Sequence, residues 1–135
     1  MNVVYDANVV ASAVCWNGDP WRCLIRLAQR KAFAWGTDFT LDETRRTCLR
    51  LIQENRPNHN AAGRLTWYME NVRAIEPAPL GKPCSRDIND DPYLACALAA
   101  QARYLVTSDN DLLILEKPLG IEMVTPARFL RFLGR

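Results

Sequence analysis

Acidic residues stand at three places in the sequence where an apolar segment begins or ends. Asp6 follows the run "NVVY", which is rich in β-branched residues, and Asn8 comes two positions later. Asp109 follows "YLVTS", and Asp91 stands directly before Pro92 at the start of an alanine-rich segment. A carboxylate next to apolar sequence is costly unless a partner compensates its charge. Several carboxylates gathered together repel one another, so a divalent cation with oxygen ligands is their natural counter-ion.

The same acids also fit ordinary structural roles, and the residues alone leave both interpretations open. Asp6 could cap a helix that follows it. Asp91 before Pro92 is typical of a helix start, and a capping carboxylate still has a second oxygen to offer. Asp109 and Asp111, in the sequence "SDND", are typical turn residues.

Further acids lie in less informative settings. Asp87 and Asp90 belong to a polar segment with several prolines, and we interpret them as loop and turn residues rather than ligands. Glu43 projects away from the apolar stripe of its predicted helix, so periodicity places it in solvent. It also stands three residues before Arg46, a spacing that allows a surface ion pair. Spacing alone therefore does not select Glu43 as a ligand.

Composition excludes several other kinds of site. The five cysteines are an odd number without a C-x-x-C pair, which argues against a disulfide framework and a zinc site. His59, the one histidine, lies between two asparagines in a polar turn. Any metal must therefore be held by oxygen, which favours Mg²⁺ or Mn²⁺. The sequence lacks a signal-peptide pattern and an apolar run long enough to cross a bilayer, so we expect a cytoplasmic protein without membrane contact.

Short apolar runs alternate with amphipathic segments along the chain, which predicts an α/β protein, and we expect residues 1–135 to form one domain. Asp19 and Thr125, each before a proline, are predicted helix caps. Strands joined by helical crossovers imply a parallel sheet covered on both faces, whose carboxyl ends share one edge. The predicted strands are 2–5, 33–36, 104–108 and 121–124, and the predicted helices are 8–13, 19–32, 40–55, 60–72, 91–102, 110–115 and 126–133.

Three segments resemble the PIN domain, the small nuclease fold of VapC-type toxins. "VVYDANVVASAV" is similar to the opening strand of that family and its D-x-N step, and "LDETRRTCL" resembles the helix that carries its glutamate. "RDINDDPYLACALAAQARYLVTSDNDLLIL" followed by "GIEMVTPARFL" resembles its C-terminal half. The order and spacing of the three segments are far more specific than D-x-N alone. The resemblance implies a three-layer α/β/α sandwich with a short, mainly parallel central sheet.

The resemblance also implies a catalytic site, with two departures from the family pattern. Ala7 replaces a small hydroxyl residue within the opening motif, and Thr44 follows Glu43 where the family usually has leucine. The implied catalytic metal ligands are Asp6, Glu43, Asp91 and Asp109, with Asp111 as a fifth candidate and with Asn8 and Thr107 supporting them by hydrogen bonds.

The function implied by the resemblance is that of an endoribonuclease that uses Mg²⁺ or Mn²⁺ to hydrolyse phosphodiester bonds of RNA. It further implies the toxin of a type II toxin–antitoxin pair, a homodimer, and a cognate antitoxin that covers the acidic pocket. Arg46 and Arg50 share the predicted helix face of Glu43, where they could hold the RNA backbone.

Other classes of protein compete with this interpretation. A signalling receiver domain is also a parallel α/β fold with acids at strand ends, and Lys117-Pro118 matches its lysine-proline pair. Receivers, however, place an acidic pair after the first strand, where Asp6 stands alone. A haloacid-dehalogenase-type phosphatase needs a second aspartate at the position of Asn8. A PIN-fold module that binds RNA without cutting it is the remaining alternative.

Overall fold

Five short parallel strands form the centre of the computed structural model, which describes residues 1–134 and leaves Arg135 outside the described part. The sheet order is β3-β2-β1-β4-β5, and every neighbouring pair is parallel. The strands are β1 (Asn2–Tyr5), β2 (Phe33–Gly36), β3 (Arg73–Ala74), β4 (Tyr104–Val106) and β5 (Glu122–Val124). The predicted parallel sheet is confirmed, and β3 is an additional strand that the sequence did not predict.

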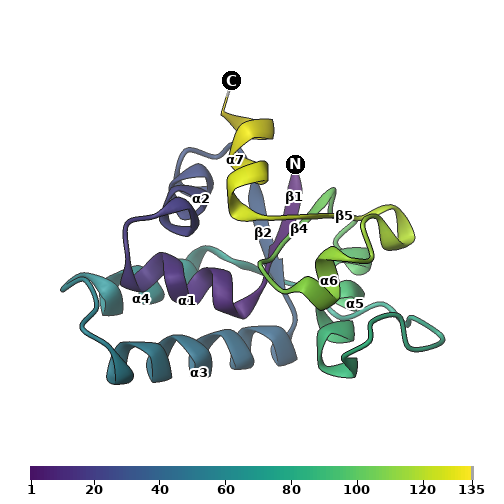
Figure 1. Ribbon diagram of the computed structural model, residues 1–135, viewed down its shortest axis with the longest axis horizontal. Helices are drawn as coiled ribbons and strands as arrows, with labels where there is room; N and C mark the ends of the chain where they lie inside the picture. The colour runs from purple at the N-terminus through teal and green to yellow at the C-terminus, as the bar shows by residue number, and fades with distance from the viewer. Residues whose placement is uncertain (135) are drawn as a thin grey trace.

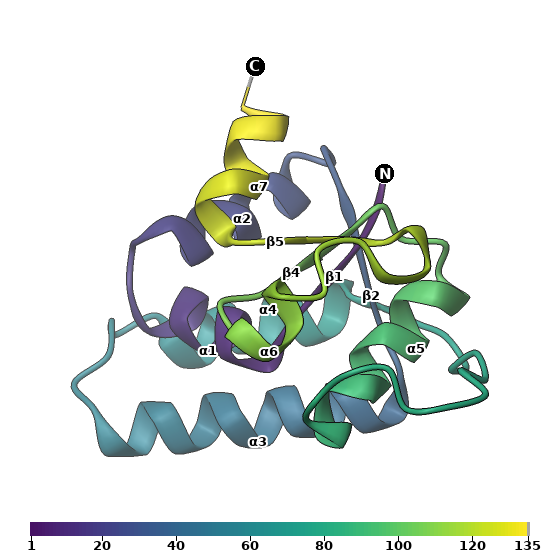
Figure 2. The same cartoon turned by 45° about the vertical axis from the view of Figure 1, so that its right-hand side comes forward.

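Helices cover both faces of this sheet and make a three-layer sandwich. In both views α3 runs beneath α1, and α7 packs on α2 close to the N-terminus of the chain (Figures 1 and 2). The α-helices are α1 (Ala7–Cys15), α2 (Asp19–Ala28), α3 (Asp38–Glu54), α4 (Ala61–Asn71), α5 (Asp91–Ala99), α6 (Asn110–Leu113) and α7 (Pro126–Leu133), and the 3₁₀ turns are η1 (Ile88–Asp90) and η2 (Pro118–Gly120). No helix within residues 1–134 is long and apolar enough to cross a bilayer.

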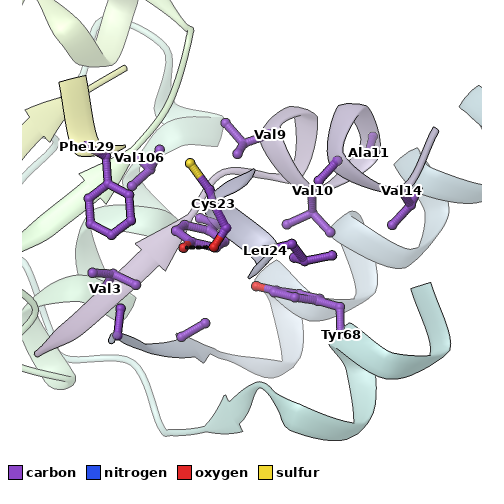
Figure 3. Close-up of a cluster of buried hydrophobic side chains, with 14 of the residues drawn as sticks. Val3, Val9, Val10, Ala11, Val14, Cys23, Leu24, Tyr68, Val106 and Phe129 are labelled. Atoms are coloured by element: carbon purple, nitrogen blue, oxygen red, sulfur yellow. Dashed lines mark hydrogen bonds between the residues drawn. The ribbon is translucent and has the colours of Figure 1, made fainter. Parts of the chain in front are cut away.

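Two apolar clusters, one on each face of the sheet, hold the layers together. Alternation along β1 sends Val3 and Tyr5 into the cluster with α1, α2 and α7, and sends Val4 into the cluster with α5. Figure 3 shows the first cluster, in which Val10 and Val14 of α1 lie on one side and Phe129 of α7 lies beside Val106 on the other. The five cysteines are free, as the sequence predicts. Because the strands are buried between these clusters, the residues that follow them are held in place at the carboxyl edge of the sheet.

Some helix boundaries differ from the predicted ones for local reasons. The helix predicted at 19–32 ends at Ala28, and Arg30 takes a φ of 60°, which is incompatible with a continuing helix. Asp19 lies inside α2 and pairs with Arg22 at 2.8 Å, so its predicted capping role is wrong. Thr125 does cap α7, because its side chain accepts a hydrogen bond from the Arg128 amide at 3.3 Å.

Candidate functional site

A polar cavity of about 340 Å³ is lined by five acidic side chains from separate parts of the chain, Asp87 among them. Asp6 follows β1, Glu43 lies on α3, Asp90 ends η1, and Asp109 follows β4. The residues that line the cavity are Asp6, Ala7, Asn8, Glu43, Arg46, Thr47, Arg50, Asp87, Asn89, Asp90 and Asp109. The carboxyl ends of the adjacent strands β1 and β4 thus place two of the acids next to each other, as the parallel topology requires.

Asp6 is buried and held by one hydroxyl group. The Thr107 hydroxyl donates to Asp6 Oδ2 at 2.8 Å, and the Asp109 amide donates to Thr107 Oγ1 at 3.0 Å. Burial raises the pKa of Asp6, and the hydrogen bond from Thr107 opposes this increase. The Asp6 side chain makes no capping hydrogen bond to α1, so the capping interpretation does not account for it.

Glu43 is half-buried and lines the cavity rather than projecting into open solvent. The Tyr93 hydroxyl donates to Glu43 Oε1 at 2.5 Å. The ion pair with Arg46 that its spacing allowed does not form, because Arg46 Nε instead contacts Asp42 Oδ2 at 2.9 Å. Burial raises the pKa of Tyr93 well above its usual value, so this hydroxyl remains a donor at neutral pH. Glu43 is therefore held toward the cavity from α5.

Asp91 differs from the prediction, because its carboxylate does not line the cavity. Its Oδ1 accepts a hydrogen bond from the Ser85 amide at 2.8 Å, and its Oδ2 accepts one from the Cys84 amide at 3.1 Å. Asp90, which the sequence interpretation assigned to a turn, lines the cavity in its place. Adjacent side chains at a helix start point in directions about 100° apart. The carboxylate of Asp90 therefore faces the cavity, whereas that of Asp91 faces the backbone of the preceding loop.

Asp90 is the acid whose surroundings most require a counter-ion. It is 8% exposed, and its Oδ2 has no hydrogen-bond partner among residues 1–134. Burial, followed by the charge of Asp109, raises the pKa of Asp90 to about 7. A buried carboxylate oxygen without a partner carries a full desolvation penalty, which a bound cation would remove. The all-oxygen donor set around it therefore fits Mg²⁺ or Mn²⁺.

The acidic region extends beyond the cavity lining. Carboxylate oxygens of Asp87, Asp90 and Asp111 lie within 4.8 Å of one another. Asp111, the fifth candidate, lies outside the lining and pairs with Arg86 at 2.6 Å. Asp109 Oδ1 accepts from the Asp111 amide at 2.9 Å, so Asp109 both caps α6 and faces the cavity. Asp109 and Asp111 thus lie in a turn, as their sequence indicates, and this position does not exclude a role as ligands.

Positive and neutral polar groups also line the cavity. Arg46 and Arg50, both exposed on α3, line the cavity on the Glu43 side, as their predicted helix face requires. Asn8 lines it from α1, whereas Thr107 acts from behind through its hydrogen bond to Asp6. The cavity therefore has an acidic interior and a basic border, which suits a cation inside and a polyanion outside.

The fold and the cavity together define an α/β protein with a cluster of acidic side chains at the carboxyl edge of a parallel sheet. The PIN domain family model matches residues 2–111, and the chain belongs to this family. PIN domains are generally nuclease domains that use divalent metals.

A solved structure supports the same fold. The chain is similar to the crystal structure of PAE2754 from Pyrobaculum aerophilum, with a TM-score of 0.63 and 17% sequence identity over 100% of this chain and 91% of that chain. No protein of curated function matches the chain by sequence. The receiver and dehalogenase alternatives therefore lose their support, and the question that remains within the family is whether this chain cuts RNA.

Proposed function

We propose that this protein is an endoribonuclease that hydrolyses phosphodiester bonds of RNA with Mg²⁺ or Mn²⁺. One observation carries the proposal: five carboxylates line one cavity, and the buried Oδ2 of Asp90 has no hydrogen-bond partner among residues 1–134. Such a site is expensive to maintain in a protein that binds no cation, because like charges held close together oppose folding. The nuclease character of PIN domains supplies the reaction class.

Asp6, Glu43, Asp90 and Asp109 are the residues that would hold the cation. When bound, a divalent ion supplies a hydroxide nucleophile at neutral pH and positive charge at the scissile phosphate. The Thr107 hydroxyl holds the Asp6 carboxylate in one orientation. The described residues contain no histidine or cysteine in the cavity lining that could act as base or nucleophile, so the carboxylates are the groups available for proton transfer.

Arg50 is the residue best placed to hold the RNA backbone. Arg46 already pairs with Asp42, whereas no ion pair of Arg50 occurs within residues 1–134. We expect R50A to weaken RNA binding and to lower the slope of log affinity against log salt by about one. Fluorescence anisotropy with single-stranded RNA over a salt series measures this slope, and Arg22 on α2 provides the control variant R22A. An unchanged slope in R50A contradicts the assignment.

We further propose that this ribonuclease acts in the cell as the toxin of a type II toxin–antitoxin pair. The support for this role is the resemblance of the three segments to VapC-type toxins. It includes a homodimer, a cognate antitoxin that covers the acidic cavity, and action in the cytoplasm on cellular RNA. Induced expression of the chain should arrest bacterial growth, and expression of D6N should not. Equal growth in both cultures contradicts the toxin role.

The enzymatic proposal is tested by comparing the purified protein with D6N and D90N on a panel of structured RNAs. We expect cleavage by the wild type with Mn²⁺, none with chelator, and a loss of at least about 100-fold in each variant, as removal of a direct metal ligand requires. Equal cleavage by all three proteins would reveal a contaminating nuclease. RNA binding without cleavage by the wild type would favour the non-cleaving PIN-fold module.

A further inference from the structure

Tyr93 is a buried residue of α5 to which the sequence interpretation gives no role. Its side chain is 1% exposed, and its hydroxyl donates the hydrogen bond of 2.5 Å to Glu43 Oε1. The contact joins α5 to α3, residues 50 positions apart in the sequence. An aromatic ring alone would fill an apolar site. A hydroxyl group that is directed at a carboxylate therefore indicates that its hydrogen bond has a role of its own.

Glu43 needs such a contact more than the other acids of the cavity. Its side chain has more rotatable bonds than that of aspartate, so fixing it costs more conformational entropy. Asp6 is restrained by Thr107, and Asp109 by the amide of Asp111. Within residues 1–134, Tyr93 is the only hydrogen-bond partner of the Glu43 carboxylate.

Thr44 lies on the same helix as Glu43, close to the Tyr93 phenol. It is 2% exposed, and its hydroxyl opposes the increase in the pKa of Tyr93. This is the position where the family resemblance expects leucine, so the departure has a physical explanation here. A threonine next to the phenol provides that oxygen with a second polar partner in a buried place.

We propose that Tyr93 is the positioning residue for Glu43. Its hydroxyl holds Oε1 and thereby fixes the orientation of the carboxylate, whose Oε2 makes no hydrogen bond within residues 1–134 and is left for a cation. Supporting hydrogen bonds of this kind typically change metal affinity by about 10- to 100-fold. The inference deepens the proposed metal-dependent function and rests on it.

The test compares the variant Y93F with the control Y5F, in which a different buried tyrosine loses its hydroxyl group. Tyr5 is 2% exposed, and its hydroxyl donates to the Cys23 carbonyl at 2.8 Å on the opposite side of β1 from Val4. We expect Y93F to bind Mn²⁺ about 10-fold or more weakly, by calorimetry, and Y5F to bind it like the wild type. In RNA cleavage we expect Y93F to lower kcat with KM nearly unchanged, because the arginines rather than Glu43 hold the RNA.

A double-mutant cycle shows whether Tyr93 acts through Glu43. In an E43A background, the additional change Y93F should leave Mn²⁺ affinity unaltered, because the group that it positions is gone. Unaltered Mn²⁺ affinity in Y93F alone, or an equal loss in Y5F, overturns the positioning role while leaving the proposed function intact. Failure of the wild type to bind Mn²⁺ and to cut RNA overturns both.

Discussion

Asp90 and Asp91 are neighbours in the sequence with opposite surroundings. Asp91 is satisfied by backbone amides of Cys84 and Ser85, which fastens the loop before α5 to the start of that helix. Asp90 faces other carboxylates, and one of its oxygens has no partner among the described residues. One carboxylate thus stabilises the fold, whereas the other destabilises it as long as its charge has no counter-ion.

The pair D90N and D91N separates these two roles. We expect D90N to lose Mn²⁺ affinity by at least about 100-fold without a loss of stability. D91N should keep its Mn²⁺ affinity and lose about 1–2 kcal/mol of unfolding free energy, because an amide has one acceptor oxygen for two backbone donors. Calorimetric titration and urea denaturation measure the two quantities. A D91N variant that loses metal affinity as completely as D90N would restore Asp91 as the ligand.

The raised pKa of Asp90 makes the metal-free protein sensitive to pH in a definite direction. The folded-state pKa is about 7, above an unfolded-state value of about 4, so the folded protein holds an extra proton between these values. Its stability must therefore fall as pH rises through this window. With chelator present, we expect the melting temperature of D90N to exceed that of the wild type more at about pH 8 than at about pH 5. If D90N and the wild type differ in melting temperature by the same amount at both pH values, the raised pKa of Asp90 is contradicted.

At the scale of elements, the position of Glu43 depends on where α3 begins. The Thr37 side chain accepts from the Thr40 amide at 3.2 Å, and Thr40 Oγ1 accepts from the Thr37 amide at 2.9 Å, which makes a reciprocal cap directly after β2. This cap fixes the first turn of α3, one turn before Glu43. The junction between strand and helix thus orients the acid.

We expect T37A to lower the free energy of unfolding by about 1–2 kcal/mol and to weaken Mn²⁺ binding. The matched control is T125A, which removes the cap of α7 away from the cavity. It should cost about 0.5–1 kcal/mol, because its contact of 3.3 Å is exposed, and leave Mn²⁺ affinity unchanged. Equal effects of both variants on Mn²⁺ affinity would show that the cap of α3 does not position the site.

The sequence predicted strands from short apolar runs, as in β1 and β2, and it predicted a helix where an apolar stripe follows a proline, as in α7. It missed β3 because two exposed residues, Arg73 and Ala74, carry no apolar pattern. It placed Asp6, Glu43 and Asp109 in the site, through strand ends and through family resemblance. It could not distinguish Asp90 from Asp91, because the direction of a side chain at a helix start depends on a loop that closes only in the folded chain.

At the scale of the whole molecule, the cavity exists only when the sheet is assembled. Its acids come from positions between 6 and 109, and β1 must lie between β2 and β4 to bring the first and last of them together. No short segment of the chain contains the site. Binding of the proposed cation would therefore be linked to global folding rather than to a local loop.

This linkage predicts that Mn²⁺ raises the melting temperature of the entire protein and that chelator reverses the increase. Free Mn²⁺ at about 100 times its dissociation constant adds about 2.7 kcal/mol, and each kcal/mol raises the melting temperature by about 4 °C in a domain of this size. D6N should lose most of this response. D19N, which removes an exposed acid that pairs with Arg22 on α2, should keep it. An equal response of D6N and D19N would mean that Mn²⁺ binds outside the cavity, and the carboxylates that line it would then need another explanation.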